Sequence, residues 1–345
     1  MTRDIFGSLF DAQDIRLDKL GNPLLELDKA IDWEAFRPLL DKAQQTKRKS
    51  KLGAPRKDVV MIFKGLVIQS LYGLSDDQLE FQVEDRRSFQ RFLGLNNHQR
   101  SPDAKTFWAF RNRLSELTLL DDLFKAFTAQ LNQAGYLARK GQIIDASLIQ
   151  VPIQRNTREE NKQIKENDVP EDWDSHKRRQ KDTDARWTQK NGKHSYGYKN
   201  HISIDNGHKL IRDYDVTEAN VHDSNVHDSN VFDELLDEGN SNKDVWADSA
   251  YRSTEQEASL KKAGYRSKVQ RKGCKNKKLT NWEKQGNHTR SKTRCRVEHV
   301  FGAQSNLRKK AIRSIGRVRA RTEIGMMNLV YNMRRFCYLE RMSVS

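Results

Sequence analysis

The sequence lacks any long hydrophobic run. No segment approaches the roughly 20 consecutive apolar residues that a membrane-spanning helix requires, so we expect no membrane partner. Residues 1–11 lack the basic start and apolar core of a signal peptide, and the expected compartment is therefore the cytoplasm. The three cysteines, Cys274, Cys295 and Cys337, form no Cys-x-x-Cys pair, which argues against a zinc ribbon and against a disulfide framework. What remains is a polar globular composition, with 36% hydrophobic and 32% charged residues.

Charge is distributed unevenly along the chain. The 345 residues carry a formal charge of +16. Residues 261–321 hold 21 lysines and arginines but only two acids, Glu283 and Glu298, so the basic character is concentrated in this segment. A solvated surface explains most charge runs. A run this long and one-sided favours a polyanion as partner, because phosphate contacts supply much of the affinity of nucleic-acid binding. The segment therefore predicts a nucleic-acid partner.

The first part of the chain is predicted to be helical. Residues 1–50 balance nine basic against nine acidic residues and suggest short helices. Residues 51–138 predict an all-helical domain of helix-turn-helix character, because apolar residues recur at helical spacing from residue 59 to 71. A later helix of this domain carries Arg111 and Arg113, two candidate DNA contacts. A helical scaffold without base contacts explains the same pattern, and both interpretations stay open.

Residues 139–340 predict a mixed α/β domain, of the α+β or α/β class. Short β-branched runs predict strands, and an Asn-Gly pair predicts a hairpin turn. The expected strands lie at residues 142–149, 201–205, 210–216, 245–248 and 265–270. Residues 154–193 are interpreted as a long polar loop, and residues 265–293 as a basic insertion before a helix that starts near Thr293.

A short tandem repeat lies inside this domain. The residues Asn-Val-His-Asp-Ser at 220–224 recur at 225–229. Two copies of five residues are too few for a solenoid, so we interpret them as a local duplication before a helix.

Three acidic residues stand where acids are otherwise disfavoured. Asp145 and Asp248 each follow an apolar run, and Glu298 is the only acid in residues 284–321. Metal-dependent cleavage of a phosphodiester needs such carboxylates, because two divalent ions about 3.5–4 Å apart stabilise the attacking and the leaving oxygen. Mg²⁺ prefers oxygen ligands of this kind. Each acid also has a simpler interpretation, since an Asp at a strand end commonly caps a turn and Glu298 can pair with Arg294.

Several motifs, taken in order, resemble those of bacterial insertion-sequence transposases. They are Ile143-Ile144-Asp145-Ala146, Tyr196-Gly197-Tyr198-Lys199-Asn200-His201, Ala247-Asp248-Ser249-Ala250-Tyr251 and Arg294-Cys295-Arg296-Val297-Glu298-His299-Val300-Phe301. Residues 102–106 resemble the N-terminal domain of these enzymes, and residues 328–332 resemble their C-terminal helix. Over roughly residues 55–340, the combination resembles the insertion-sequence-five group of the insertion-sequence-four-like superfamily of Asp-Asp-Glu (DDE) transposases.

The resemblance implies an enzyme with a ribonuclease-H-like mixed-sheet catalytic domain behind the helical DNA-binding domain. Asp145, Asp248 and Glu298 would be its catalytic residues and would bind two Mg²⁺ ions, with Mn²⁺ as a substitute. The implied reaction is hydrolytic nicking at the ends of the element, followed by attack of the freed 3′-hydroxyl groups on target DNA. The implied partners are double-stranded DNA, as terminal inverted repeats and as target, and a second copy of the chain in a homodimer. The expected location becomes the bacterial nucleoid.

Basic and aromatic residues near the acids are candidate DNA contacts. The related transposases often carry the pattern Tyr-x-x-Arg-x-x-x-Glu-x-x-x-x-x-x-Lys, which Arg294 and Glu298 match. Ser291 and Ser305 stand at the Tyr and Lys places. Lys309 would lie on the helical face of Glu298 and could serve instead as a phosphate contact. The other candidates are Tyr198, Lys199, Arg296, His299 and Arg308. For the tyrosine, packing beside the site is an equally open role.

Two other functions stay open at this stage. The first is a catalytically inactive, sequence-specific DNA-binding protein or repressor derived from a transposase, which would bind DNA without cutting it. The second is a ribonuclease or junction resolvase on the same fold, which would cut without joining.

Overall fold

The structure is a computed structural model that describes residues 12, 14–45, 55–96, 99–166, 168–190, 192–221, 231–273, 278–307 and 311–344. The chain forms two compact units, residues 1–113 with 333–345 and residues 114–332. Most of the tandem repeat lies outside the described residues. Among the described residues no single helix is long and apolar enough to cross a membrane, although one pair bent by 104°, residues 59–72 and 76–85, meets the length and composition test jointly.

The first unit is helical, as predicted. Its elements are α2 (Pro23–Ala30), η1 (Glu34–Phe36), α3 (Arg37–Gln44), α4 (Val59–Tyr72), α5 (Asp76–Asp85), α6 (Arg87–Leu93) and most of α7 (Ala104–Glu116). Asp58 caps α4 by accepting two backbone N–H groups, and Ser75 and Gln78 form a capping box at the start of α5. The core is partly aromatic, with Trp33 edge-on to Phe63. The helix-turn-helix character stays a prediction.

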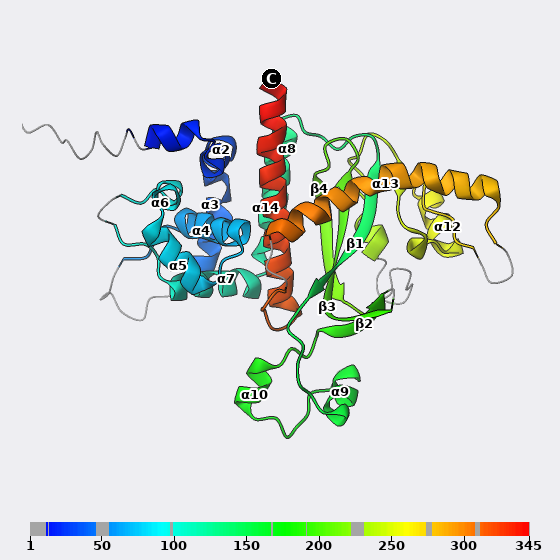
Figure 1. Ribbon diagram of the computed structural model, residues 1–345, viewed down its shortest axis with the longest axis horizontal. Helices are drawn as coiled ribbons and strands as arrows, with labels where there is room; N and C mark the ends of the chain where they lie inside the picture. The colour runs from blue at the N-terminus through cyan, green and yellow to red at the C-terminus, as the bar shows by residue number, and fades with distance from the viewer. Residues whose placement is uncertain are drawn as a thin grey trace, which may run out of the picture. The chain divides into compact units, whose positions relative to one another are not determined.

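Within the described part of the second unit, six strands form one mixed sheet (Figure 1). They are β1 (Gln142–Gln150), β2 (Arg186–Lys190), β3 (Lys193–Asp205), β4 (Ile211–Glu218), β5 (Asp244–Trp246) and β6 (Arg266–Ser267). β3 pairs with β2 along its first part and with β4 along its second, and β1 lies antiparallel on its other edge. β5 runs parallel to β1, and β6 runs parallel to β5. The predicted mixed sheet is confirmed, but β3 begins earlier than expected.

The stretch predicted as a long polar loop is ordered, which corrects that prediction. It holds the two short helices α9 (Arg158–Lys165) and α10 (Ser175–Gln180), which Figure 1 shows beyond the end of β2. Thr157 and Glu160 form a capping box that starts the first helix. The hydrogen bond from Lys177 is the main reason that the pKa of Glu160 falls to about 2, and the indole N–H of buried Trp173 donates to the same carboxylate. Helix capping and the burial of the Trp173 ring thus stabilise the structure of this polar segment.

Two long helices pack beside β4. They are α8 (Leu119–Gln133) and α14 (Arg317–Val344), the second of which runs through both units. The expected helical domain, residues 51–138, includes α8, but α8 belongs to the second unit, where its apolar face packs on β4. The ring of Phe124 contacts that of Tyr214, whose hydroxyl donates to Asp121 at 2.7 Å. α14 comes close to β4 at Gly325, where an added Cβ would lie 2.4 Å from the hydroxyl oxygen of Tyr214.

Two asparagines tie α14 to the sheet. Asn328 exchanges amide hydrogen bonds with Asn200 of β3 at 3.0 and 3.1 Å, and accepts another from Gln304 at 2.7 Å. Asn332 pairs with both the N–H and the carbonyl of Ile211 in β4, at 2.9 and 2.7 Å. All three asparagines are fully buried. The presence of these buried polar residues is explained by polar pairing between helix and sheet.

Leucine in place of Asn328 should destabilise the protein by about 3 kcal/mol, because it strands the Asn200 amide and the Gln304 donor in the core. Urea denaturation followed by circular dichroism measures the loss. A second replacement, Asn200→Leu, should cost less in this variant than alone, because no orphaned amide then remains between the two positions. A loss below about 1 kcal/mol for the single variant would contradict the pairing role.

The remaining helices cover the β1–β5 part of the sheet. They are α11 (Val231–Glu234), η2 (Ser249–Tyr251), α12 (Thr254–Lys262) and α13 (Asn281–Leu307). Ile144 and Val245 of the strands form one buried cluster with Phe232, Tyr251 and Leu260 of these helices. α13 packs against both β1 and β5 and lies across the sheet in Figure 1. It begins well before the predicted start, inside the stretch interpreted as a basic insertion.

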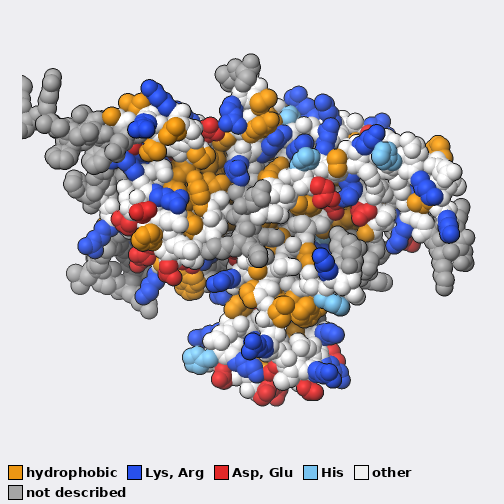
Figure 2. All heavy atoms as spheres, viewed as in Figure 1, with side chains coloured by type: hydrophobic (Ala, Val, Ile, Leu, Met, Phe, Trp, Pro, Cys, Tyr) orange, Lys and Arg blue, Asp and Glu red, His pale blue; other side chains and the backbone are white. Residues whose placement is uncertain are grey.

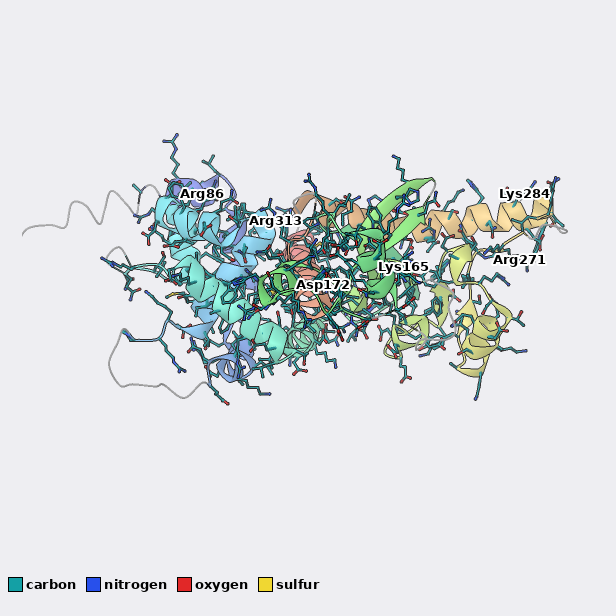
Figure 3. All side chains as sticks on the ribbon, turned by 90° about the horizontal axis from the view of Figure 1, so that it is seen from below. Arg86, Lys165, Asp172, Arg271, Lys284 and Arg313 are labelled. Atoms are coloured by element: carbon teal, nitrogen blue, oxygen red, sulfur yellow. The ribbon has the colours of Figure 1, made fainter. Side chains whose placement is uncertain are left out.

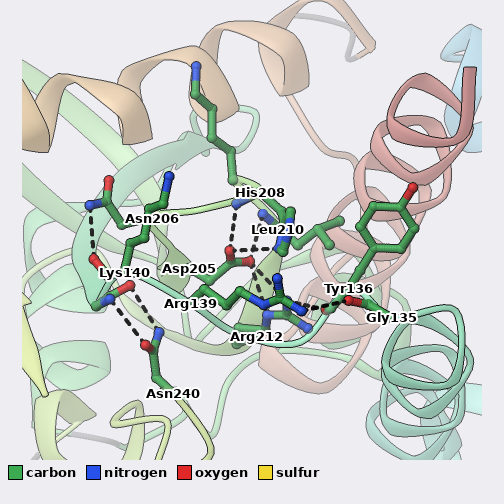
Figure 4. Close-up of polar contacts among 12 residues, drawn as sticks. Gly135, Tyr136, Arg139, Lys140, Asp205, Asn206, His208, Leu210, Arg212 and Asn240 are labelled. Carbon is green, nitrogen blue, oxygen red and sulfur yellow. Dashed lines mark hydrogen bonds and ion pairs between the residues drawn. The ribbon is translucent and has the colours of Figure 1, made fainter. Parts of the chain in front are cut away.

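The turn between β3 and β4 is built around a buried acid (Figure 4). Asp205 is fully buried and accepts hydrogen bonds from the guanidinium of Arg212 and from the backbone N–H of His208. Arg212 donates further to the carbonyl oxygen of Tyr136, at 2.7 Å. The amide of Asn206 donates to the carbonyl oxygen of Lys140, at 3.0 Å, immediately before β1. The turn is thus fixed to the chain that leads into β1.

Candidate active site

The first two predicted acids follow the paired part of two neighbouring parallel strands. β1 and β5 pair with Ile143 opposite Trp246. Each acid follows its residue of this pair by two positions, Asp145 within β1 and Asp248 beyond the end of β5. Both carboxylates are partly buried. Asp248 also accepts the backbone N–H of Ser249 at 2.6 Å and caps η2, so the simpler capping interpretation holds alongside the functional one.

α13 carries the third acid to the same place. Val297 and Val300 are fully buried, which leaves Glu298 at the rim with 58% of its side chain exposed. The guanidinium of Arg294, one turn earlier, contacts the carboxylate of Asp145. The same nitrogen lies 3.6 Å from Oε1 of Glu298. A single guanidinium therefore links two acids that are far apart in the sequence, and the predicted pairing of Arg294 with Glu298 is confirmed. Figure 2 shows acidic side chains gathered over the middle of α13, with basic and histidine side chains along the rest.

The acids influence one another electrostatically. Burial raises the pKa of Asp145 to about 6, although the positive charge of Arg294 opposes the rise. The negative charges of Glu298 and Asp248 raise that pKa further. Both neighbouring charges thus act in the same direction as burial on Asp145.

The donor chemistry suits a hard divalent ion, since carboxylate oxygens are the ligands that Mg²⁺ and Mn²⁺ prefer. Among the described residues, no three His, Cys, Asp or Glu side chains lie close enough together to hold one ion as they stand. Arg294 supplies the positive charge between Asp145 and Glu298, where a cation held by those two acids would lie. The residues thus fit a divalent ion in chemistry, and Arg294 must turn away before both acids can act as ligands.

Comparison with known protein families places the chain. Residues 137–333 match the family described as Transposase DDE domain. The chain belongs to this family. Residues 12–113 match a second family, described as Transposase domain (DUF772). The predicted relationship to DDE transposases of bacterial insertion sequences is confirmed, while the insertion-sequence-five group stays a prediction.

One curated relative and one solved structure are similar to the chain at low to moderate sequence identity. The chain is 31% identical over 202 residues to the transposase for insertion sequence element IS1106 of Neisseria meningitidis serogroup B. That match covers 57% of this chain and 65% of the relative, so the chain spans a little under two thirds of the relative's length. Among solved structures, the chain is similar to a cryo-EM structure of the piggyBac transposase synaptic complex with hairpin DNA, at a TM-score of 0.46 and 13% identity. This likeness covers 93% of the chain and 76% of that structure.

Two predicted DNA contacts on β3 of this DDE-family domain, Tyr198 and Lys199, form hydrogen bonds within the protein. Tyr198 is fully buried, and its hydroxyl oxygen lies 2.8 and 2.9 Å from the two carboxylate oxygens of Asp182. Burial and the charge of Asp182 raise the pKa of Tyr198. This placement corresponds to packing, the other role considered for Tyr198. Lys199 donates to the carbonyl oxygen of Val221 at 2.6 Å.

The predicted contacts on α13 differ in their surroundings. Arg296 donates to the carbonyl and side-chain oxygens of Asn206, at 2.6 and 2.7 Å, and thereby fixes α13 to the β3–β4 turn. His299 is exposed beside Glu298. Arg308 and Lys309 lie outside the described residues.

The two candidate contacts of the first unit lie on α7. Arg111 forms an ion pair with Asp76 and donates to Gln69, each at 2.7 Å, so it links α7 to α5 and α4. Arg113 is partly buried. A DNA-binding role for either arginine stays a prediction.

Sequence reasoning missed two residues that support the site. Asp182, buried beneath Tyr198, stood in a segment so rich in charge that nothing set it apart. The sequence predicts Asn206 as a turn residue. Its hydrogen bonds with Arg296 join residues 90 positions apart in the sequence. Neither role has a local sequence signal.

Proposed function

We propose that this protein is a DNA transposase that nicks the ends of an insertion sequence by metal-dependent hydrolysis and joins the freed 3′-hydroxyl ends to target DNA. The observation that carries the proposal is the contact of Arg294 with both Asp145 and Glu298, where the charge of Asp248 also raises the pKa of Asp145, in a chain of the Transposase DDE domain family. The sheet supports a ribonuclease-H-like catalytic domain, because the antiparallel strands β1, β3 and β4 continue into the parallel strands β5 and β6.

The proposal extends to partners and location. We propose double-stranded DNA as the substrate, both as terminal inverted repeats and as target, a homodimer as the working form and the bacterial nucleoid as the location. The basic segment of residues 261–321 supports the choice of DNA, because its charge attracts a phosphate backbone over a long distance.

Each group of the site has a separate task in this reaction. Asp145, Asp248 and Glu298 would hold Mg²⁺ or Mn²⁺ ions, which activate water and stabilise the leaving oxygen when bound. The backbone N–H of Ala146 orients Asp145 at 2.8 Å. Arg294, once it has left the carboxylates, presents a planar fork of donors to the phosphate oxygens of the DNA.

A nicking assay tests the proposal directly. The protein is incubated with a labelled duplex that carries one end of the element, together with target DNA and MgCl₂ or EDTA. We expect a new 3′-hydroxyl at the element end and a joined product, both only with MgCl₂. Binding without nicking would support the inactive DNA-binding protein instead. Cleavage without joining would support a nuclease or resolvase.

Removal of Arg294 should strengthen the response to metal. In Arg294→Met, Asp145 and Glu298 face each other without a cation, so the metal-free protein should melt at a lower temperature than wild type. MnCl₂ should then raise the melting temperature by roughly 2–4 °C more in the variant than in wild type. Thermal melts in EDTA and in MnCl₂ measure this difference, with Arg294→Lys as the charge-retaining control. An equal or smaller MnCl₂ effect in Arg294→Met would show that the guanidinium does not compete with the ion.

A further inference from the structure

Three arginines from separate elements lie within electrostatic reach of one another beside the N-terminal half of α13. Arg252 ends η2, four residues after Asp248. Arg271 follows β6, and Arg290 lies on α13 two turns before Glu298. Figure 3 shows Arg271 near Lys284 of α13, toward the end of the helix that lies away from Glu298.

Hydrogen bonds hold the three elements in place. Arg252 donates to the carbonyl oxygen of Val269 at 3.1 Å. Asn287 of α13 accepts the backbone N–H of Arg271 at 2.8 Å and donates to its carbonyl oxygen at 2.9 Å. The neighbouring Gln270 donates to Ser291 of α13 at 2.6 Å. The arginines are therefore fixed near one another by ordered backbone.

Charge within this cluster is not balanced. Arg252 lies 3.4 Å from a carboxylate oxygen of Glu257, and Arg271 lies 2.8 Å from one of Glu283. Arg290 pairs with no described carboxylate, and its guanidinium donates only to the side-chain oxygen of Asn287, at 3.3 Å. Burial, followed by the positive charges of Arg271 and Arg252, lowers the pKa of Arg290. Holding like charges together in this way costs stability, which an anion would restore.

We propose that Arg252, Arg271 and Arg290 form a phosphate-binding site that holds the DNA backbone a few nucleotides from the bond that is cut. Arg290, Arg294 and Glu298 are spaced four residues apart, so they line one face of α13. Arg290 therefore lies about 12 Å along the helix axis from Glu298. A DNA strand whose scissile phosphate lies at the acids would pass the arginine cluster, and guanidinium groups suit phosphate oxygens through bidentate hydrogen bonds.

The choice of DNA as ligand rests on the proposed transposase function. DNA binding measured without metal tests the phosphate site separately from nicking. Fluorescence anisotropy in EDTA, over a range of KCl concentrations, measures the affinity of full-length protein for the element-end duplex. Arg290→Gln should weaken binding roughly tenfold. It should also reduce the slope of log affinity against log salt by about 0.9, the value for one lost phosphate contact. Arg290→Lys should keep the slope, because the charge remains, but lose part of the affinity with the forked geometry.

The matched control removes a cation that already has a partner. Arg266 belongs to the same basic segment, but Asp244 at 2.6 Å already offsets its charge, so Arg266→Gln should change affinity and slope much less than Arg290→Gln. Single neutral methylphosphonates placed along the duplex then locate the contact. One position should weaken binding by wild type but have little further effect on Arg290→Gln, because both changes remove the same interaction.

The outcomes separate this site from the proposed function. If Arg290→Gln matches Arg266→Gln in slope, or if its effect adds fully to that of every methylphosphonate, the phosphate site is overturned even where nicking is normal. If Arg290→Gln reduces the slope as expected but wild type never nicks DNA, the phosphate site stands and the proposed enzymatic function fails.

Discussion

Asparagine in place of Asp145 or Asp248, and glutamine in place of Glu298, should each slow DNA nicking by roughly a thousandfold or more. Each change removes an anionic oxygen while nearly keeping the shape of the side chain, so it acts on ion binding rather than on packing. The rate of MgCl₂-dependent nicking of an end-labelled duplex, measured in a single turnover, tests this expectation.

DNA binding should survive in all three variants, because lysines and arginines attract phosphates and a lost carboxylate only reduces repulsion. Asp244→Asn is the matched control, since Asp244 lies at the opposite end of β5 and pairs with Arg266. It should nick at the wild-type rate. Near-normal nicking by all three acid variants would refute the assignment, as would equal inactivity of Asp244→Asn.

The sequence singles out the three acids because each combines an unusual context with a simple chemical requirement, and their catalytic role stays a prediction. Apolar runs before Asp145 and Asp248 predict buried strands, and each acid follows the parallel pair of Ile143 in β1 and Trp246 in β5 by two residues. The contact of Arg294 with Asp145 was not predictable, because it spans 149 positions and depends on how α13 crosses the sheet. Local patterns identify the elements, whereas contacts between distant segments arise only from packing.

Two errors in predicted secondary structure share one cause. The start of α13 was placed too late, and α9 was missed inside a polar stretch. Both helices open with a capping box, Thr280 with Glu283 and Thr157 with Glu160. The Thr-x-x-Glu signal was present at both places. No periodic apolar run follows either signal, so hydrophobic periodicity alone predicts neither helix start.

Gly197→Ala should destabilise the second unit by about 3–5 kcal/mol. Gly197 has a φ of +154° and lies where β3 changes its partner from β2 to β4. A Cβ there would lie 2.0 Å from the carbonyl oxygen of Ile149 in β1. The obstacle is backbone rather than the end of a flexible side chain, so the strain can be relieved only if β1 moves away from β3. Urea denaturation followed by circular dichroism measures the loss.

The same movement would reach the candidate active site, because Asp145 lies on β1 four residues before Ile149. Gly197→Ala should therefore nick more slowly than its folded fraction alone explains. Gly302→Ala is the control, since its Cβ would meet no described atom within 4 Å and alanine favours a helix by roughly 0.5–1 kcal/mol. If Gly197→Ala kept wild-type stability, β1 and β3 could not approach as closely as their register requires.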